Sequence, residues 1–124
     1  MVLVDTSVWI RHLSNRAPYT AQLQRLLDSS EVLGHELIYG ELLIGNRGGR
    51  RKVLQEYAYL PAAAIIHHTE LVEFVLGHAL MGRGIGWIDA HLLASTMLSQ
   101  GRLWSADQPL IEVARELGVN YEFR

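Results

Sequence analysis

Short apolar runs alternate with amphipathic helical patterns along the chain, and this alternation restricts the possible folds more than any other feature. Residues 1–4 form an all-apolar run, as is typical of a strand covered on both faces. Similar runs predict strands at residues 62–66, 103–105 and 119–123, whereas residues 32–33 are too few to assign. Because strands separated by helices pair in parallel, we expect an α/β domain with a mostly parallel sheet and helices on both faces.

Helical patterns fill most of the remaining sequence, at residues 8–13, 20–28, 35–45, 50–59, 69–81, 87–100 and 109–118. The chain has 124 residues, of which 49% are apolar, so we expect one folded domain over residues 1–124. No apolar run approaches the roughly 20 residues that cross a bilayer, and the first residues lack the basic segment of a secretory signal. The sequence has no cysteine, which excludes thiol chemistry. We therefore expect a cytoplasmic protein that does not enter a membrane.

Four carboxylates occupy positions that suit either a local structural role or a functional site. Asp5 follows the first strand and Asp107 follows the strand at 103–105, at the edge where open α/β sheets carry their sites. Glu41 has apolar neighbours three and four residues away on its helix, and Asp89 falls in the first turn of the helix at 87–100. Each aspartate can also cap a turn or helix, and Glu41 can form an ion pair, so none is conclusive alone.

These four acids become informative if the fold brings them together, because four carboxylates do not share a dry pocket without cations. Oxygen ligands of this kind suit Mg²⁺ or Mn²⁺, which activate water for displacement at phosphorus. Lys52 is the only lysine, so mechanisms that need a catalytic lysine have one candidate. The composition therefore favours metal-assisted hydrolysis over nucleophilic catalysis by a side chain.

Four segments of the chain resemble PIN-domain ribonucleases, and specifically the VapC toxins of VapBC toxin–antitoxin pairs. They are VLVDTSVW at residues 2–9, GELLIGN at 40–46, GRGIGWIDAHLLA at 82–94 and LWSAD at 103–107, in the order of the family. The resemblance implies a three-layer α/β/α domain with a five-stranded parallel sheet. It also implies a metal-dependent endoribonuclease that cleaves RNA phosphodiesters with metal-activated water.

The resemblance assigns roles to six residues of this sequence. It implies a catalytic, metal-binding quartet of Asp5, Glu41, Asp89 and Asp107 that holds Mg²⁺ or Mn²⁺. It also implies hydroxyls near the metal at Thr6 and Ser105, although the family more often has threonine at the second position. Residues 36–40 repeat the Glu-Leu-x-x-Gly form of residues 41–45, which leaves Glu36 as an alternative to Glu41. The apolar flanks of Glu41 and the preceding His35 favour Glu41.

The resemblance further implies an RNA substrate, a cognate VapB-type antitoxin, and a homodimer or a toxin–antitoxin hetero-oligomer. The candidates for RNA binding are the cations near the predicted site, Arg47, Arg50, Arg51, Lys52 and Arg83. The formal net charge is −2, but with the quartet set aside nine carboxylates face 11 Lys and Arg. The charge therefore does not oppose RNA binding.

Two other kinds of function stay open from the sequence. A phospho-acceptor signalling domain also places aspartates at strand ends, but it needs an acidic pair near the first strand and a lysine near the last. Here Thr6 and Ser7 follow Asp5, and Lys52 lies mid-chain. A catalytically silent PIN-fold binding module is the second alternative, which the complete quartet disfavours.

Overall fold

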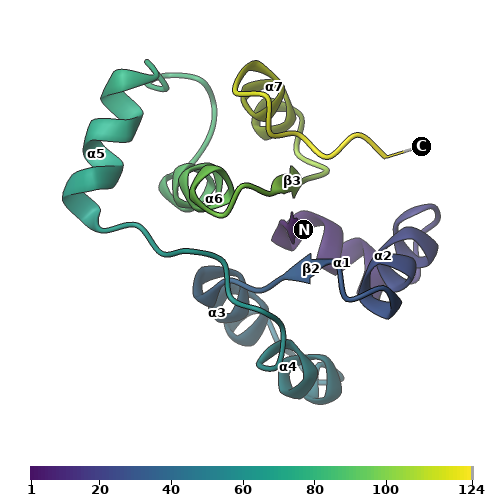
Figure 1. Ribbon diagram of the computed structural model, residues 1–124. Helices are drawn as coiled ribbons and strands as arrows, with labels where there is room; N and C mark the ends of the chain where they lie inside the picture. Colours follow the sequence, from purple (N-terminus) through teal and green to yellow (C-terminus); the bar gives the residue numbers. More distant parts are fainter. Residues whose placement is uncertain (124) are drawn as a thin grey trace.

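The computed structural model describes residues 1–123 and shows helices packed around a small parallel sheet (Figure 1). Its elements in chain order are β1 (Val2–Val4), α1 (Thr6–Leu13), α2 (Tyr19–Asp28), β2 (Val32–Leu33), α3 (Glu36–Ile44), α4 (Arg51–Tyr57), α5 (His68–Gly77), α6 (Trp87–Leu98), β3 (Arg102–Trp104) and α7 (Gln108–Glu116). The predicted α/β class with a parallel sheet is confirmed.

The sheet has the order β2-β1-β3, and both pairings are parallel. Val2 pairs with Val32 on one side and with Arg102 on the other, and Val4 pairs with Trp104. The central strand β1 is buried along its whole length, as its all-apolar sequence predicts. Its carboxyl end delivers Asp5 next to the end of β3, where the Asp5 N–H donates to the Trp104 carbonyl at 2.9 Å.

The prediction of five strands is wrong in detail, because residues 1–123 contain three. The segments expected as strands at 62–66 and 119–123 each contribute one isolated parallel bridge, Ala62 to Gly34 and Asn120 to Leu103. They lie beside β2 and β3 respectively, so five parallel segments form the layer and the outer two pair only locally. Conversely, Val32–Leu33, too short to assign from sequence, forms β2.

Helices cover both faces of this layer. In Figure 1, α1 and α2 lie to the right of the strands and α3 and α4 below them, while α6 lies to the left and α7 above. A continuous core fills the interior, and Leu3, Leu92 and Leu103 in it are fully buried. Gly101 immediately precedes β3, and a Cβ there would lie 2.9 Å from the Met1 carbonyl oxygen, so only glycine allows the chain to enter the sheet at this point.

The helices follow the predicted amphipathic patterns with shifted ends. The helix expected at 69–81 ends at Gly77 as α5, and a residue in the left-handed region follows at Ala79 with φ 53°. The helix expected at 8–13 begins at Thr6 as α1, directly after the site residue Asp5. Within residues 1–123, no helix is long and apolar enough to span a bilayer.

Candidate active site

Asp5 occupies the N-cap position of α1, but its side chain makes no capping hydrogen bond to that helix. Its Oδ2 instead accepts hydrogen bonds from the hydroxyls of Ser7, at 2.7 Å, and Ser105, at 2.9 Å. Only 7% of Asp5 is exposed. The strand end therefore presents a buried carboxylate that two neutral donors hold in one orientation, and the capping interpretation does not account for it.

Ser7 and Ser105 bind Asp5 and also organise the loop that follows β3. The Ser7 hydroxyl accepts the N–H of Ala106 at 3.0 Å, and the Ser105 hydroxyl accepts the N–H of Asp107 at 3.0 Å. The carboxyl ends of β1 and β3 are thus joined through two side-chain hydroxyls. The sequence pointed to Ser105 near the site, but Ser7 was missed, because a serine three residues after a strand is also an ordinary helix-start residue.

Glu41 reaches the same edge of the sheet from the middle of α3. Its Oε1 accepts a hydrogen bond from the Thr6 hydroxyl at 2.6 Å, a short distance typical of a bond to a carboxylate. Thr6 is the first residue of α1, so α1 carries the hydroxyl that positions the carboxylate of another helix. The structure therefore brings together Asp5, Thr6 and Glu41.

Asp89 and Asp107 lie at the starts of two helices, where each accepts a backbone N–H of the first turn. The Asp89 Oδ2 accepts the N–H of Gly86 at 2.9 Å at the start of α6. Asp107 is the N-cap of α7, and its Oδ2 accepts the N–H of Leu110 at 3.4 Å. The capping roles considered from the sequence are therefore present, and each carboxylate keeps a second oxygen for another ligand.

Three of the four carboxylates lie within electrostatic range of the fourth, Asp89. Burial raises the pKa of the Asp89 carboxyl above its usual value, and the N–H of Gly86 opposes this increase. The negative charges of Asp5, Asp107 and Glu41 raise that pKa further. The fold thus gathers all four acids of the predicted quartet around Asp89.

No cation of the described chain neutralises this cluster. The ion pairs within residues 1–123 join Lys52 to Glu56, Arg83 to Glu116 and Arg115 to Glu122, and none involves the quartet. Over the same residues, no three acidic or histidine side chains converge closely enough to form a ready-made cation cage. The four carboxylates are therefore oriented by neutral donors and have no ion-pair partner among the described residues.

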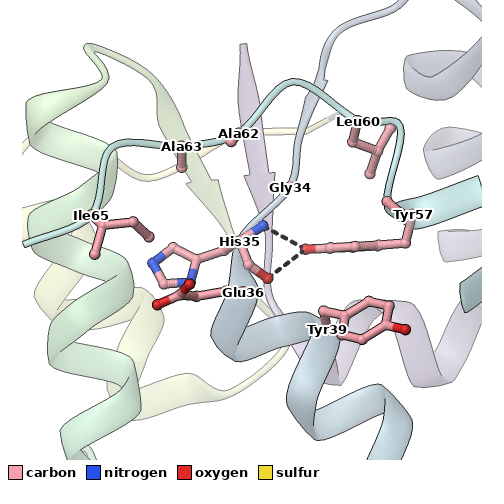
Figure 2. A pocket seen from close by; sticks show the side chains of 10 residues that line it. Gly34, His35, Glu36, Tyr39, Tyr57, Leu60, Ala62, Ala63 and Ile65 are labelled. Carbon is pink, nitrogen blue, oxygen red and sulfur yellow. Dashed lines mark hydrogen bonds between the residues drawn. The ribbon is translucent and has the colours of Figure 1, made fainter.

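Glu36, the alternative to Glu41, lies elsewhere. It is exposed at the start of α3, and it borders a cavity of about 330 Å³ with His35, Tyr39, Tyr57 and Ile65 (Figure 2). The geometry favours Glu41 as the acid of the cluster, because Glu41 contacts Thr6 and acts on Asp89, whereas Glu36 acts on the pKa of His35.

His35 connects the helices that carry Glu41 and Asp89. Its Nδ1 accepts the N–H of Leu37 and caps α3, and its Nε2 lies 3.0 Å from the hydroxyl of Ser95 on α6. The Tyr57 hydroxyl accepts the His35 N–H at 2.9 Å (Figure 2). Burial lowers the pKa of His35, so the ring stays neutral near pH 7. His35 therefore has a structural role that its position before Glu36 did not reveal.

The predicted RNA-binding cations differ in whether another group of the protein already binds their side chains. Arg83 donates two hydrogen bonds of 2.8 Å to Glu116, and Arg50 donates to the Leu42 carbonyl at 2.9 Å. The Lys52 ammonium lies 4.0 Å from Glu56. Arg47 and Arg51 are exposed. None of the five contacts the carboxylate cluster in the described structure, so an RNA-binding role for them stays a prediction.

Comparison with known proteins extends these observations. A family model described as "PIN domain" matches residues 2–116. Two curated proteins named "Ribonuclease VapC32", from Mycobacterium tuberculosis strains CDC 1551 / Oshkosh and ATCC 25618 / H37Rv, are each 42% identical over 120 residues. The aligned region covers 96% of this chain and 94% of each relative.

Proposed function

The chain belongs to the PIN-domain family, and from that premise we propose that it is an endoribonuclease that hydrolyses RNA phosphodiesters at its carboxylate cluster. This proposal rests mainly on one observation: the described residues bring no cation to the carboxylates of Asp5, Glu41, Asp89 and Asp107, which lie close enough to interact with Asp89. The relatives named ribonuclease VapC32 support RNA as the substrate and the toxin of a toxin–antitoxin pair as the role.

We propose that the cluster works with Mg²⁺ or Mn²⁺, and the residues fit such an ion. Asp5 is buried and the pKa of Asp89 is raised, so binding of a positive ion would stabilise the cluster. All donors in it are carboxylate or hydroxyl oxygens, the ligands that these ions prefer. Asp5 and Asp89 would hold the ion, with Glu41 and Asp107 completing the shell. When bound, the ion supplies an activated water and stabilises negative charge at phosphorus.

The side chains around the quartet then have positioning roles. Ser7 and Ser105 both donate to Oδ2 of Asp5, so they fix the orientation of this carboxylate and leave Oδ1 without a hydrogen bond among the described residues. Thr6 fixes Glu41 in the same way. Hydrogen bonds of this kind raise the precision of a metal site without contacting the ion. The fold therefore prepares the acids before any ligand arrives.

The exposed arginines are the residues that we expect to steer the RNA substrate. Arg47 and Arg51 precede and begin α4 and are exposed, so they can attract RNA phosphates. Arg83 is less suited, because its guanidinium is occupied by Glu116. A loss of RNA affinity in Arg47→Ala and Arg51→Ala but not in Arg83→Ala would support this division.

We further propose a VapB-type antitoxin partner and a homodimer or a toxin–antitoxin hetero-oligomer, on the strength of the VapC name of the relatives. The chain offers apolar surface for such contacts: Ile44 at the end of α3 and Tyr59 just after α4 are each 90% exposed. Sedimentation analysis of the purified protein tests the dimer. A monomer at all concentrations, without antitoxin, would remove that part of the proposal.

The nuclease is tested by incubating the purified protein with cellular RNA in Mg²⁺, Mn²⁺ or EDTA and mapping the cut sites. Asp5→Asn and Asp89→Asn should abolish cleavage while the fold is kept. Asp28→Asn is the matched control, because Asp28 is exposed and only Gln24 donates to it. An Asp89→Asn protein that cuts RNA at the wild-type rate would rule out the proposed site, whereas a wild-type protein that cuts no RNA in either ion would favour the silent binding module.

A further inference from the structure

A second cavity lies directly against the carboxylate cluster. It has a volume of about 270 Å³ and is lined by residues including Tyr19, Ser105, Ala106, Gln108, Asn120 and Phe123. Ser105 also binds Asp5, and the Ala106 N–H donates to Ser7 of the cluster. The dipeptide at 105–106 is therefore a shared wall, with carboxylates on one side and the cavity on the other.

Aromatic rings form the sides of this cavity. Tyr19 stacks on Trp104 with ring centroids 6.1 Å apart and an interplanar angle of 21°. The rings of Tyr121 and Phe123 each lie 5.5 Å from that of Trp104, and both residues are only partly buried. Flat aromatic surfaces at the edge of a site are the platforms on which proteins stack single-stranded bases.

The Tyr19 wall is tied to the carboxylate cluster by Arg11. The Arg11 guanidinium lies 5.5 Å from the centre of the Tyr19 ring, and its Nη1 donates to the Ser7 carbonyl at 2.9 Å. The cavity therefore keeps a fixed position relative to Asp5, because Arg11 and Ser105 link them from two sides.

Two amide side chains supply polar groups to the cavity. Gln108 makes no side-chain hydrogen bond to any residue from 1 to 123, so its donors and acceptor are available. Asn120 donates through Nδ2 to Glu122 at 3.0 Å and to the Tyr121 carbonyl at 3.5 Å, whereas its Oδ1 receives no hydrogen bond within the described chain. Amides carry both donors and acceptors and pair with the edges of bases.

The charges of the cavity favour a neutral ligand. Among the described residues that line it, the one guanidinium is that of Arg115, which donates to both carboxylate oxygens of Glu122, at 3.0 and 3.4 Å. The remaining polar groups of the wall are hydroxyls and amides. A phosphate needs unpaired cations, whereas a heterocyclic base needs stacking surface and neutral hydrogen-bonding groups.

We propose that this cavity binds one unpaired nucleobase of the RNA, next to the phosphodiester held at the carboxylate cluster, and that Gln108 and Asn120 select the base. The inference rests on the proposed function for its RNA substrate. It adds a specificity site that the quartet cannot provide, because carboxylates and a metal contact phosphate and sugar only. The shared wall at 105–106 places the selected base within a nucleotide of the cut.

Binding tests the cavity without any cleavage. Fluorescein-labelled RNA octamers of A, C or U are titrated in Mg²⁺ against Asp5→Asn protein, and against the same protein with Gln108→Ala or Asn120→Ala added. We expect one octamer to bind best, and either added substitution to reduce that preference about tenfold, the size of losing one amide–base pair. Gln55→Ala on α4 is the matched control, because this exposed amide makes no hydrogen bond within residues 1–123 and lies outside the cavity.

Cut-site mapping on an RNA pool provides the second arm. The wild-type protein should favour one base beside the cut, and Gln108→Ala should lose that preference while still cutting. Equal binding of all octamers, no measurable binding, or a preference unchanged in both cavity variants would overturn the base site even if RNA is cut. If no RNA is cut but the binding preference depends on Gln108, the nuclease proposal fails and the base site stands.

Discussion

Replacing Ser105 with alanine removes one hydroxyl that joins two acids of the cluster. That hydroxyl donates to Asp5 at 2.9 Å and accepts the N–H of Asp107 at 3.0 Å, and Ser105 is buried. A hydrogen bond to a charged group contributes about 1.5–3 kcal/mol to stability. Because Ser7 still donates to Asp5, we expect a loss of about 2 kcal/mol in the free energy of unfolding.

The loss converts into a measurable change in melting temperature. Unfolding entropy near 60 °C is about 2.1 cal/mol/K per residue, so for a chain of this length each kcal/mol shifts Tm by about 4 °C. Ser105→Ala should therefore melt about 8 °C below the wild type in a far-UV circular dichroism scan in EDTA at pH 7. Since the substitution also frees Asp5 and Asp107, RNA cleavage in Mg²⁺ should fall about 10- to 100-fold.

Two variants separate this effect from the loss of any serine. Ser99→Ala also removes a hydroxyl, one that accepts the Ala64 N–H at 2.9 Å away from the cluster, so it should leave cleavage unchanged. Ser105→Thr keeps the hydroxyl and should keep most of the activity. If Ser105→Ala melts within about 2 °C of the wild type and cuts RNA at the full rate, the bridging role assigned to this hydroxyl is wrong.

Three further predictions follow from the same contacts. Thr6→Val loses the 2.6 Å bond to Glu41 and should cut RNA about tenfold more slowly in initial-rate assays, whereas Thr6→Ser should not. Burial and the other carboxylates raise the pKa of Asp89, so the folded protein binds this proton more tightly than the unfolded chain does. Its ionisation therefore costs stability as pH rises through the range above the usual carboxyl pKa. Asp89→Asn should accordingly raise Tm in EDTA at pH 7, and saturating Mg²⁺ should raise Tm more for the wild type than for Asp89→Asn. Burial lowers the pKa of His35, so the unfolded chain takes up its proton first, and Tm should fall as pH drops below about 6.5 in a melting series from pH 5 to 8.

The positions of Asp5 and Glu41 illustrate what the sequence could predict. An apolar run that ends in aspartate locates a strand end, and the strand end locates the site edge of a parallel sheet. The apolar stripe around Glu41 predicted an inward-facing carboxylate, and the structure places it against Thr6. Both inferences use periodicity and burial, which depend on residues a few positions apart.

The outer strands show where such patterns stop being sufficient. The apolar runs at 62–66 and 119–123 predicted strands, yet each forms a single bridge. Gly34 exchanges backbone hydrogen bonds with Pro61 and Ala63, after which the chain leaves the sheet toward α5. An apolar run indicates that a segment is buried, but the number of ladder bonds depends on where the chain must go next.

Contacts between residues far apart in the sequence could not be predicted from the sequence either. Arg83 lies between glycines near Asp89 and therefore was a candidate for RNA binding, but it pairs with Glu116, 33 residues further on. The Ser105 hydroxyl bonds to Asp5, which lies 100 residues earlier in the sequence, and to Asp107, which lies two residues later. The roles of such side chains depend on contacts that exist only in the folded protein.

The donors around the quartet supply the strongest physical argument for a cationic ligand. Asp5 and Glu41 receive neutral hydroxyls, while Asp89 and Asp107 receive backbone N–H groups. Neutral donors orient a carboxylate, but they leave its charge in place. The sequence has ten arginines, and within residues 1–123 two of them pair with exposed glutamates while none pairs with this cluster. A structural acidic cluster would gain from an arginine partner, because uncompensated burial is costly. A cluster that keeps its orientation and its charge is instead suited to a ligand that must enter and leave, as a catalytic divalent ion does.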